Sequence, residues 1–158
     1  MLRKLVIISG STRILKEPVD PIPALHRFDG MFIRIIRKYY TRLSDCDVLI
    51  LSPTYGLIKA KEKIGFKQPI PGSWGKLVIA DNEFLRLKES SISTLQKLLA
   101  TRQYDEIYVN LGKGMLKIIE GLDKIVPQRT KITYAYGSGI GPKMAHMKNW
   151  IESHLHTT

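Results

Sequence analysis

The sequence predicts an α/β domain with three layers (α/β/α), in which a four-stranded parallel sheet lies between helices. The main observation is that four apolar runs of strand length alternate with segments whose apolar residues recur at helical spacing. The second is the length of 158 residues, which suits one domain with one hydrophobic core. No internal repeat or linker divides the sequence, so residues 1–158 are expected to form a single domain.

The first half of the sequence contains two expected strands and one helix. Residues 4–9 form the first strand, and a loop with three prolines separates it from a helix expected over residues 28–42. The apolar residues of this helix have the spacing of one buried face, and they are Phe32, Ile35, Ile36, Tyr39 and Leu43. The second strand is expected over residues 48–52, an apolar run typical of a strand covered on both sides.

The second half begins with a long loop, expected over residues 53–74 because periodicity is lost there and Gly, Pro and Lys dominate. A helix capped by Asp81 or Asn82 follows, and its buried face is expected to carry Leu85, Ile92, Leu95 and Leu99. Two more strands are expected, over residues 106–111 and 131–136. Between them lies a short helix with the apolar residues Met115, Ile118, Ile119 and Leu122. The last helix has Pro142 at its first position, and its buried face carries Met144, Met147, Ile151 and Leu155. We expect all four strands to be parallel and the first to be central.

Three loops that follow strands are rich in glycine. Because the carboxyl ends of parallel strands meet at one edge of a sheet, these loops are expected to form a single ligand site. Glycine lets successive N–H groups face an anion, although tight turns also need glycine for geometry alone. None of the loops matches a phosphate-loop or dinucleotide fingerprint. The expected ligand-binding residues are Ser9, Gly10, Thr12, Tyr55, Gly56, Gly112, Lys113, Gly137, Gly139 and Gly141.

Two residues are candidates for catalysis, Ser11 and His26. His26 follows the first strand beside Arg27, where it is either a general acid or base, a hydrogen-bonding group for a base edge, or a surface histidine. A Ser-His-Asp arrangement using Ser11 is weakly supported, because no nucleophile elbow is present. The other histidines have no metal-ligand spacing, so neither a metal nor another cofactor is expected.

The formal charge is +11, from 25 Lys and Arg against 14 Asp and Glu. Such an excess favours a polyanionic partner, with RNA preferred, although a heat-adapted proteome also enriches lysine. The basic residues expected to contact nucleic acid are Arg34, Arg37, Lys38 and Arg42 on one helix and Lys59, Lys61, Lys63 and Lys67 in the long loop.

The N-terminal sequence and the single cysteine indicate the compartment. Neither a signal peptide nor an apolar run long enough for a membrane span is recognised, so a cytoplasmic location and no membrane partner are expected. Cys46 lies between Asp45 and Asp47, which disfavours a reactive thiolate.

Several short runs resemble a family of small prokaryotic domains of uncharacterised function. These runs are Ile8-Ser9-Gly10-Ser11-Thr12-Arg13, Pro21-Ile22-Pro23-Ala24, Leu51-Ser52-Pro53-Thr54-Tyr55-Gly56-Leu57-Ile58, and Gly139-Ile140-Gly141 with its helix. That family is similar to YaaA-type peroxide-stress proteins, which have a similar Leu-Ser-x-x-Tyr-Gly-Leu signature.

The chain also resembles the catalytic core of archaeosine synthase, a tRNA-modifying enzyme. This resemblance rests on Ser11, on His26-Arg27-Phe28, on Ser52-Pro53 with Gly56-Leu57, and on Pro69-Ile70-Pro71-Gly72-Ser73-Trp74, which is similar to a Pro-Val-Thr-Gly-x-Trp run. It implies a uracil-DNA-glycosylase-like fold. Ser9-Gly10 stand where archaeosine synthase has Pro-Cys, and the Lys-Pro-Tyr that follows there is absent. The resemblance therefore does not extend the lysine-transfer reaction to this chain.

These features favour a nucleobase- or nucleic-acid-related domain, either a tRNA-modifying transferase or hydrolase or a remnant of one. Two alternatives stay open at this point. One is a non-catalytic nucleic-acid-binding or stress-related module, which includes a subunit of a split modification enzyme. The other is a small enzyme acting on a phosphorylated metabolite.

Overall fold

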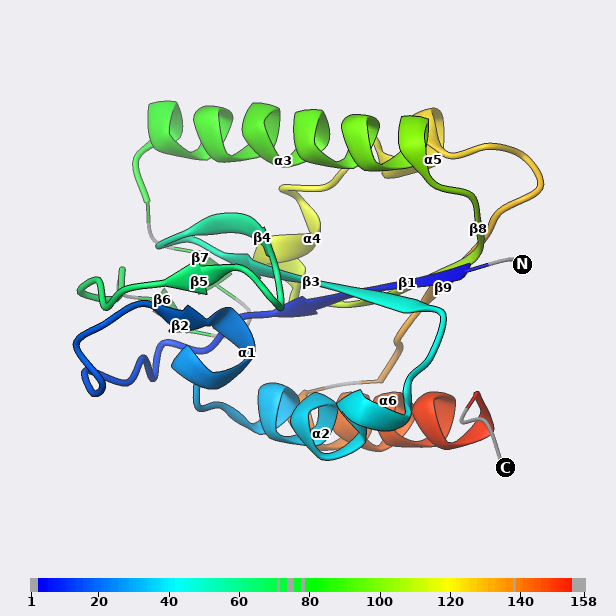
Figure 1. Cartoon of the computed structure of the whole chain (residues 1–158). Coiled ribbons are helices and arrows are strands. Elements are labelled where there is room, and N and C mark those ends of the chain that lie inside the picture. Colours follow the sequence, from blue (N-terminus) through cyan, green and yellow to red (C-terminus); the bar gives the residue numbers. More distant parts are fainter. Residues whose placement is uncertain (1–2, 71, 74–75, 78, 138, 155–158) are drawn as a thin grey trace.

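The computed structural model describes residues 3–70, 72–73, 76–77, 79–137 and 139–154, and its five-stranded sheet lies between two layers of helices (Figure 1). The strand order is β4-β3-β1-β8-β9. The bounds are Arg3–Ser9 for β1, Cys46–Ser52 for β3, Gly56–Lys59 for β4, Tyr104–Asn110 for β8 and Lys131–Tyr134 for β9. The four expected strands pair in parallel with β1 in the centre, as predicted.

The prediction of four strands is wrong, because β4 adds a fifth strand inside the segment expected to be a loop. It runs antiparallel to β3 and follows it through a tight turn. In this turn the Ser52 hydroxyl oxygen accepts the N–H groups of Thr54 and Tyr55 at 3.1 and 3.3 Å, and Gly56 has a φ of 83°. Only Leu57 and Ile58 of β4 are buried, which is too short an apolar signal to stand out from the lysines around it.

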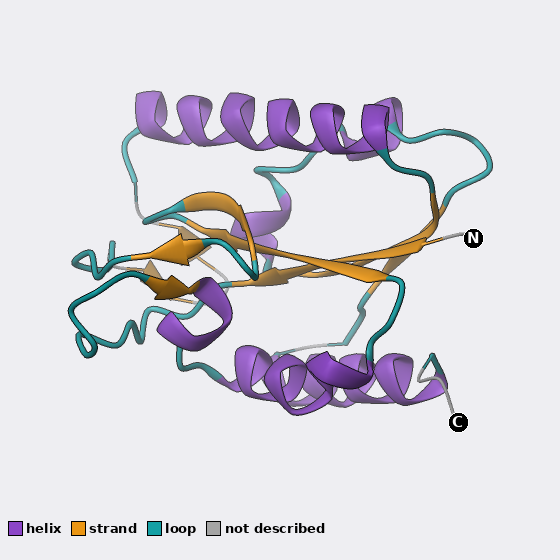
Figure 2. Cartoon of the chain, in the orientation of Figure 1, coloured by secondary structure: helices purple, strands orange, loops and turns teal. Residues whose placement is uncertain are grey.

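Helices cover both faces of the sheet (Figure 2). One face carries α1, α2, η1 and α6, which span Ala24–Arg27, Met31–Tyr39, Tyr40–Arg42 and Ile140–Ser153. The other face carries α3, α4 and α5, which span Asp81–Thr101, Lys113–Leu116 and Leu122–Ile125. Two small antiparallel pairs complete the described elements: β2 (Ile22–Pro23) with β5 (Lys63–Ile64), and β6 (Gly72–Ser73) with β7 (Lys76–Leu77).

The central strand shows why this arrangement is stable. Side chains alternate between the two faces of a strand. Accordingly Val6 and Ile8 pack with the α1, α2 and α6 layer, whereas Leu5 and Ile7 pack with the α3 layer, and all four are fully buried. Burying apolar surface on both faces supplies most of the favourable free energy of folding.

The helix expected over residues 28–42 begins three residues later, at Met31, and its last three residues form the 3-10 helix η1. Helix α1 ends at Arg27, and Gly30 precedes α2 in an extended conformation with φ −113° and ψ 175°. Residues 28–30 therefore cross from α1 to α2 outside any helix, and this crossing places Asp29 and Gly30 at the carboxyl edge of β1.

Three smaller expectations about helices also need correction. Leu85 of α3 is 56% exposed, because the buried face of that helix runs through Leu87 and Leu95 instead. The helix expected around Met115 to Leu122 is two short helices, α4 and α5. Pro142 is the third residue of α6, which begins at Ile140, so it still lies in the first turn, where no hydrogen-bonded N–H is needed.

Arg27 organises the proline-bearing loop that follows β1. It is fully buried, and its guanidinium donates to the backbone carbonyls of Leu15, Pro18, Asp20 and Ile64 at 2.8–3.1 Å. A buried charge is tolerated only when its hydrogen bonds are satisfied. From the sequence, Arg27 was a neighbour of His26 and part of a run that resembles archaeosine synthase, whereas in the structure its hydrogen bonds fix the loop against β5.

Candidate functional site

A pocket of about 460 Å³ opens at the carboxyl edge of the sheet, between the end of β1 and the start of α2. Its lining comes from five segments far apart in the sequence: Ser9 to Arg13, Asp29 to Arg34, Pro53 with Ile70, Gly114 with Met115, and Ile140. The pocket therefore lies at the edge of the sheet where the loops after the parallel strands were expected to meet.

Two glycines make the floor of this pocket possible. A Cβ on Gly10 would lie 3.1 Å from the ring of Phe28 and 3.2 Å from a methyl of Ile50. A Cβ on Gly30 would lie only 2.5 Å from the Cβ of Ser11. The loop after β1 and the start of α2 can approach each other this closely because both positions lack side chains.

The hydroxyl of Ser11 is held by this loop. Its oxygen accepts the N–H of Arg13 at 2.8 Å. Because the oxygen already accepts a bond, the hydroxyl hydrogen can be directed to a ligand acceptor such as a base carbonyl. A nucleophilic role needs an adjacent general base. Among the described contacts, the Ser11 hydroxyl meets only the backbone of Arg13 and no titratable side chain of the pocket lining.

The walls of the pocket are mostly apolar. They are formed by Met31, Phe32, Ile33, Pro53, Ile70, Met115 and Ile140. Apolar walls with a few convergent polar groups are the usual composition of a small-molecule site. A flat ring with polar edges, such as a nucleobase, matches this combination.

Charged residues stand at the mouth of the pocket around Asp29. Arg34 donates to both carboxylate oxygens, at 3.0 and 3.1 Å, and Arg37 donates to one of them at 3.3 Å. The guanidinium of Arg13 lies 3.6 Å from the carboxylate. The hydrogen bond from Arg34 is the largest of the influences that lower the pKa of Asp29 to about 2, so this carboxylate stays ionised.

The structure brings only part of the expected ligand site together. Ser9, Gly10, Ser11 and Thr12 line the pocket. The other two glycine-rich loops contribute through neighbouring residues, because Gly114 and Ile140 line it. None of the five other residues lines the pocket: Gly112, Lys113, Gly139 and Gly141 are within two residues of Gly114 or Ile140, and Gly137 is three residues from Ile140.

Gly137 and Tyr55 have contacts that explain them structurally. Gly137 has a φ of 129°, and a Cβ there would lie 2.6 Å from Pro142, so glycine is needed for the turn into α6. Tyr55 donates its hydroxyl to the carbonyl of Gly65 at 2.5 Å and packs edge-on against Phe28, with ring centroids 5.6 Å apart. Tyr55 and Gly56 do not line the pocket. The predicted stacking of Tyr55 on a ligand base therefore has no support from this pocket.

His26 is exposed on α1 and is not part of the pocket lining. The expectation that it acts together with Ser11 would require the loop to bring the two residues to one ligand. The buried Arg27 next to it instead holds α1 against β5, which fixes His26 on the outer side of that helix.

The expected basic residues divide into two groups. Arg34 lines the pocket and Arg37 joins it at Asp29, whereas Lys38 and Arg42 lie exposed further along α2 and η1. The second group is exposed around β4 and β5 and consists of Lys59, Lys61, Lys63 and Lys67. Their exposure is compatible both with a solvated surface and with contacts to nucleic acid.

Arg13, Asp29, Gly30 and the apolar wall residues were not among the expected site residues, although Arg13, Pro53, Ile70 and Ile140 stand in runs that carry the family resemblances. An Asp-Gly pair at residues 29–30 is a common turn signal and marks a break in a helical pattern. That signal was present, but the continuous helical periodicity after residue 28 concealed it. Pro71 and Trp74, which carry part of the resemblance to archaeosine synthase, lie outside the described residues.

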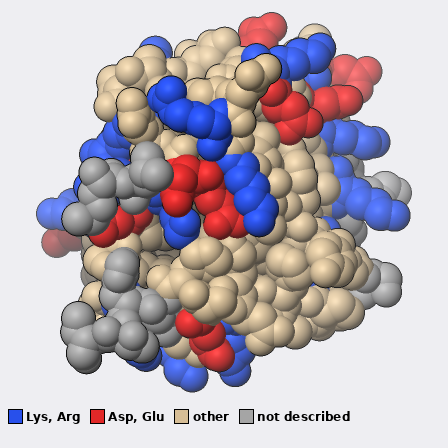
Figure 3. Space-filling model, turned by 90° about the vertical axis from the view of Figure 1, so that its right-hand side faces the viewer, with Lys and Arg blue, Asp and Glu red and all other residues tan. Residues whose placement is uncertain are grey.

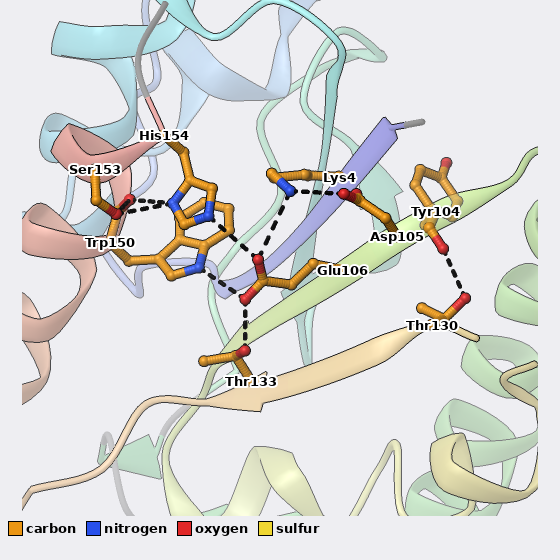
Figure 4. Close-up of polar contacts among 9 residues, drawn as sticks. All are labelled: Lys4, Tyr104, Asp105, Glu106, Thr130, Thr133, Trp150, Ser153 and His154. Atoms are coloured by element: carbon orange, nitrogen blue, oxygen red, sulfur yellow. Dashed lines mark hydrogen bonds and ion pairs between the residues drawn. The ribbon is translucent and has the colours of Figure 1, made fainter. Parts of the chain in front are cut away.

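A second polar cluster lies at the opposite, amino edge of the sheet (Figure 3). There Glu106 of β8 accepts hydrogen bonds from Thr133 and Trp150, the latter at 3.1 Å, and pairs with His154 at 3.2 Å (Figure 4). Burial alone would raise the pKa of Glu106. Those hydrogen bonds and the charges of His154 and Lys4 have a larger, opposite effect, so the pKa lies below its ordinary value.

Asp47 is the centre of the remaining polar contacts at this edge. It pairs with Arg3 at 3.4 Å and Arg102 at 3.1 Å, and accepts the Tyr104 hydroxyl at 2.7 Å. Beside it, burial and the charge of Asp47 raise the pKa of the Cys46 thiol to about 12, which agrees with an unreactive cysteine. Within the described part of the chain, no group of three or more His, Cys, Asp or Glu side chains is arranged to hold a metal ion. No described helix is long and apolar enough to cross a membrane.

Comparison with known proteins defines the fold but not the activity. No family model and no curated protein matches the sequence. The crystal structure of AF0587, a protein of unknown function, is similar with a TM-score of 0.55 and 11% sequence identity over 96% of this chain. This chain spans 45% of the length of that one. The similarity thus shows a shared α/β fold.

Proposed function

We propose that this chain is a domain that recognises a nucleobase in RNA, as tRNA-modifying enzymes do, and that the base enters the pocket at the carboxyl edge. One observation carries the proposal. The runs that resemble archaeosine synthase are separated in the sequence, yet residues of three of them, Ser11, Pro53 and Ile70, line the same pocket. As part of this proposal, the α/β fold of the chain belongs to the uracil-DNA-glycosylase-like type that the resemblance implies.

The chemistry of the pocket supports a base as the ligand. Apolar walls suit the faces of a ring, while the Ser11 hydroxyl and the backbone around Gly10 suit its polar edge. An enzyme that acts on a base must take it out of the nucleic-acid stack into such a pocket. The proposal specifies only the class of reaction, which is that of a transferase or a hydrolase acting on the base.

The charge supports a polyanionic partner. With a formal charge of +11, the chain should be attracted to a phosphate backbone, and exposed Lys38, Arg42 and the lysines around β4 and β5 are available for contacts outside the pocket. Such contacts position a nucleic acid, whereas the pocket selects the base.

Binding of labelled tRNA at increasing salt tests this proposal. The affinity should fall steeply between about 50 and about 200 mM salt, because bound phosphates release counterions. Met31→Glu places a negative charge in the pocket wall at a residue that is 48% exposed, and should weaken binding by about tenfold or more. Leu85→Glu is the matched control, since Leu85 is an exposed apolar helix residue on the opposite face of the sheet.

The outcomes separate the alternative functions. Absence of tRNA binding even at low salt would contradict the proposal and favour a phosphorylated metabolite as the ligand. Equal weakening by Met31→Glu and Leu85→Glu would indicate a general charge effect and a binding module without a base pocket. Mass spectrometry of tRNA nucleosides from a strain lacking the gene then tests for a modification reaction. If the chain modifies tRNA, one modified nucleoside should be lost in that strain.

A further inference from the structure

The charged groups at the mouth of the pocket are unequal in number and in exposure. Three guanidiniums, those of Arg13, Arg34 and Arg37, surround the single carboxylate of Asp29. The side chains of Arg13 and Arg34 are 71% and 56% exposed, whereas that of Asp29 is 18% exposed. The carboxylate thus lies inside the group and the arginines face outward, so the cluster presents excess positive charge to solvent.

The hydrogen bonds leave donors free on the outer side. Arg34 uses Nε and Nη2 on Asp29, and within the described contacts its Nη1 has no acceptor. Arg13 faces Asp29 through Nε at 3.6 Å, which leaves both of its terminal nitrogens for another acceptor. A guanidinium has five N–H donors, and its planar edge matches two oxygens of a phosphate.

Asp29 has a positioning role in this arrangement. A long arginine side chain loses conformational freedom when it binds an anion, and a side chain that is already held by a carboxylate loses less. The two-point contact of Arg34 with Asp29 fixes the plane of the guanidinium beside the pocket. An ionised Asp29 therefore orients a phosphate-binding group while lowering the total charge of the cluster.

We propose that Arg13 and Arg34 bind the phosphate of a nucleotide whose base occupies the pocket, with Asp29 as the positioning residue. This inference rests on the proposed function and names its substrate class: a nucleoside phosphate or a nucleotide within an RNA strand, in preference to a free base or nucleoside. Both arginines line the pocket together with Ser9 and Gly10, so one ligand can contact the floor and the mouth.

Calorimetric titration of the whole chain tests the inference. The ligands are the four ribonucleosides, their 5′-monophosphates, short single-stranded RNA oligonucleotides and inorganic phosphate. At least one monophosphate or oligonucleotide should bind about tenfold more tightly than the matching nucleoside, because a charged two-point hydrogen bond is added. Tighter binding of the oligonucleotide than of the monophosphate identifies a phosphodiester as the source of the phosphate.

Substitutions assign this preference to the cluster. Arg34→Gln should remove the preference for the phosphorylated ligand while leaving nucleoside affinity within about twofold. Arg86→Gln is the matched control, because Arg86 is an exposed arginine of α3, on the opposite face of the sheet and outside the cluster. Asp29→Asn should reduce the preference for the phosphorylated ligand, although it raises the net positive charge of the cluster. If Asp29 acted only through its charge, the same substitution should increase this preference.

The outcomes distinguish this inference from the proposed function. Equal affinity for nucleosides and phosphorylated ligands, with both weakened by Met31→Glu, would overturn the phosphate site and leave the base pocket standing. Phosphate-dependent binding that Arg34→Gln abolishes but Met31→Glu does not change would overturn the base pocket. A gain in phosphate preference in Asp29→Asn would overturn the positioning role.

Discussion

The two ends of the parallel sheet carry charged clusters that are built differently. At the amino edge, Asp47, Asp105 and Glu106 face Arg3, Lys4, Arg102 and His154, so acidic and basic groups are nearly balanced. At the carboxyl edge, Asp29 alone faces three arginines. The amino-edge cluster also contacts buried aromatic residues, whereas the carboxyl-edge cluster stands beside a pocket.

This difference indicates what each cluster does. Glu106 is 7% exposed and hydrogen-bonded to Trp150, so its contacts hold α6 and β9 against β8 and contribute mainly to stability. The three arginines at the carboxyl edge outnumber their acid, and Arg13 and Arg34 are exposed, so these two contribute little to stability and remain available to an anion.

The largest effect on stability is expected at Glu106. Glu106→Ala leaves the indole N–H of Trp150 and the hydroxyl of Thr133 without their acceptor and removes the pair with His154, and should lower the free energy of unfolding by about 3 kcal/mol. Urea unfolding measures this loss. Glu120→Ala is the control, since Glu120 is an exposed acid in a 3.8 Å pair with Lys88, and should change the unfolding free energy by about 0.5 kcal/mol or less. Similar losses in both variants would contradict a stabilising role for the amino-edge cluster.

A smaller loss is expected where the pocket floor is closely packed. Gly30→Ala brings a new Cβ to 2.5 Å from that of Ser11 and should cost about 2 kcal/mol. In the Ser11→Gly background the same substitution should cost much less, because the opposing Cβ is removed. Gly65→Ala is the control, since nothing lies within 4 Å of a Cβ there. An equal cost of Gly30→Ala in both backgrounds would show that the close approach is not the cause.

The smallest effect is expected from acid titration of Asp29. Its pKa is lowered from 3.8 to about 2 in the folded chain, chiefly by the hydrogen bond from Arg34. A lowered folded pKa means that the stabilisation is present above about pH 4 and is lost as the pH falls toward about 2. Thermal unfolding over this range should therefore show a shallower decline for Asp29→Asn than for the unsubstituted chain. Parallel curves would indicate that the arginines do not stabilise the carboxylate.

Much of the fold could be predicted from the sequence, because its signals are long and periodic. The parallel strands are continuous apolar runs, and α3 has 21 residues with a repeating apolar face. The strand β4 was missed because it buries only Leu57 and Ile58, and the break before α2 was missed because Gly30 interrupts an otherwise regular pattern. Short elements depend on tertiary contacts that no local pattern contains.

The candidate site was predicted in its position more accurately than in its members. The rule that loops meet at the carboxyl edge of parallel strands correctly placed Ser9 to Thr12. Residues brought in by tertiary packing, such as Met31 and Met115, carry no local signal of a site. Asp29 was missed because its role depends on contacts with three arginines. Arg34 and Arg37 follow it on α2, and Arg13 precedes it in the loop after β1.

An NMR titration of the isotope-labelled chain with tRNA tests most directly whether the carboxyl edge is the functional one. The backbone amide signals of Gly10, Ser11, Gly30 and Met31 should shift or broaden, because these residues line the pocket. The amide signals of Arg102 and Gln103, which lie at the amino edge, should keep their positions. Changes concentrated at Arg102 and Gln103, with the signals of Gly10 and Gly30 unmoved, would contradict the assignment of function to the pocket.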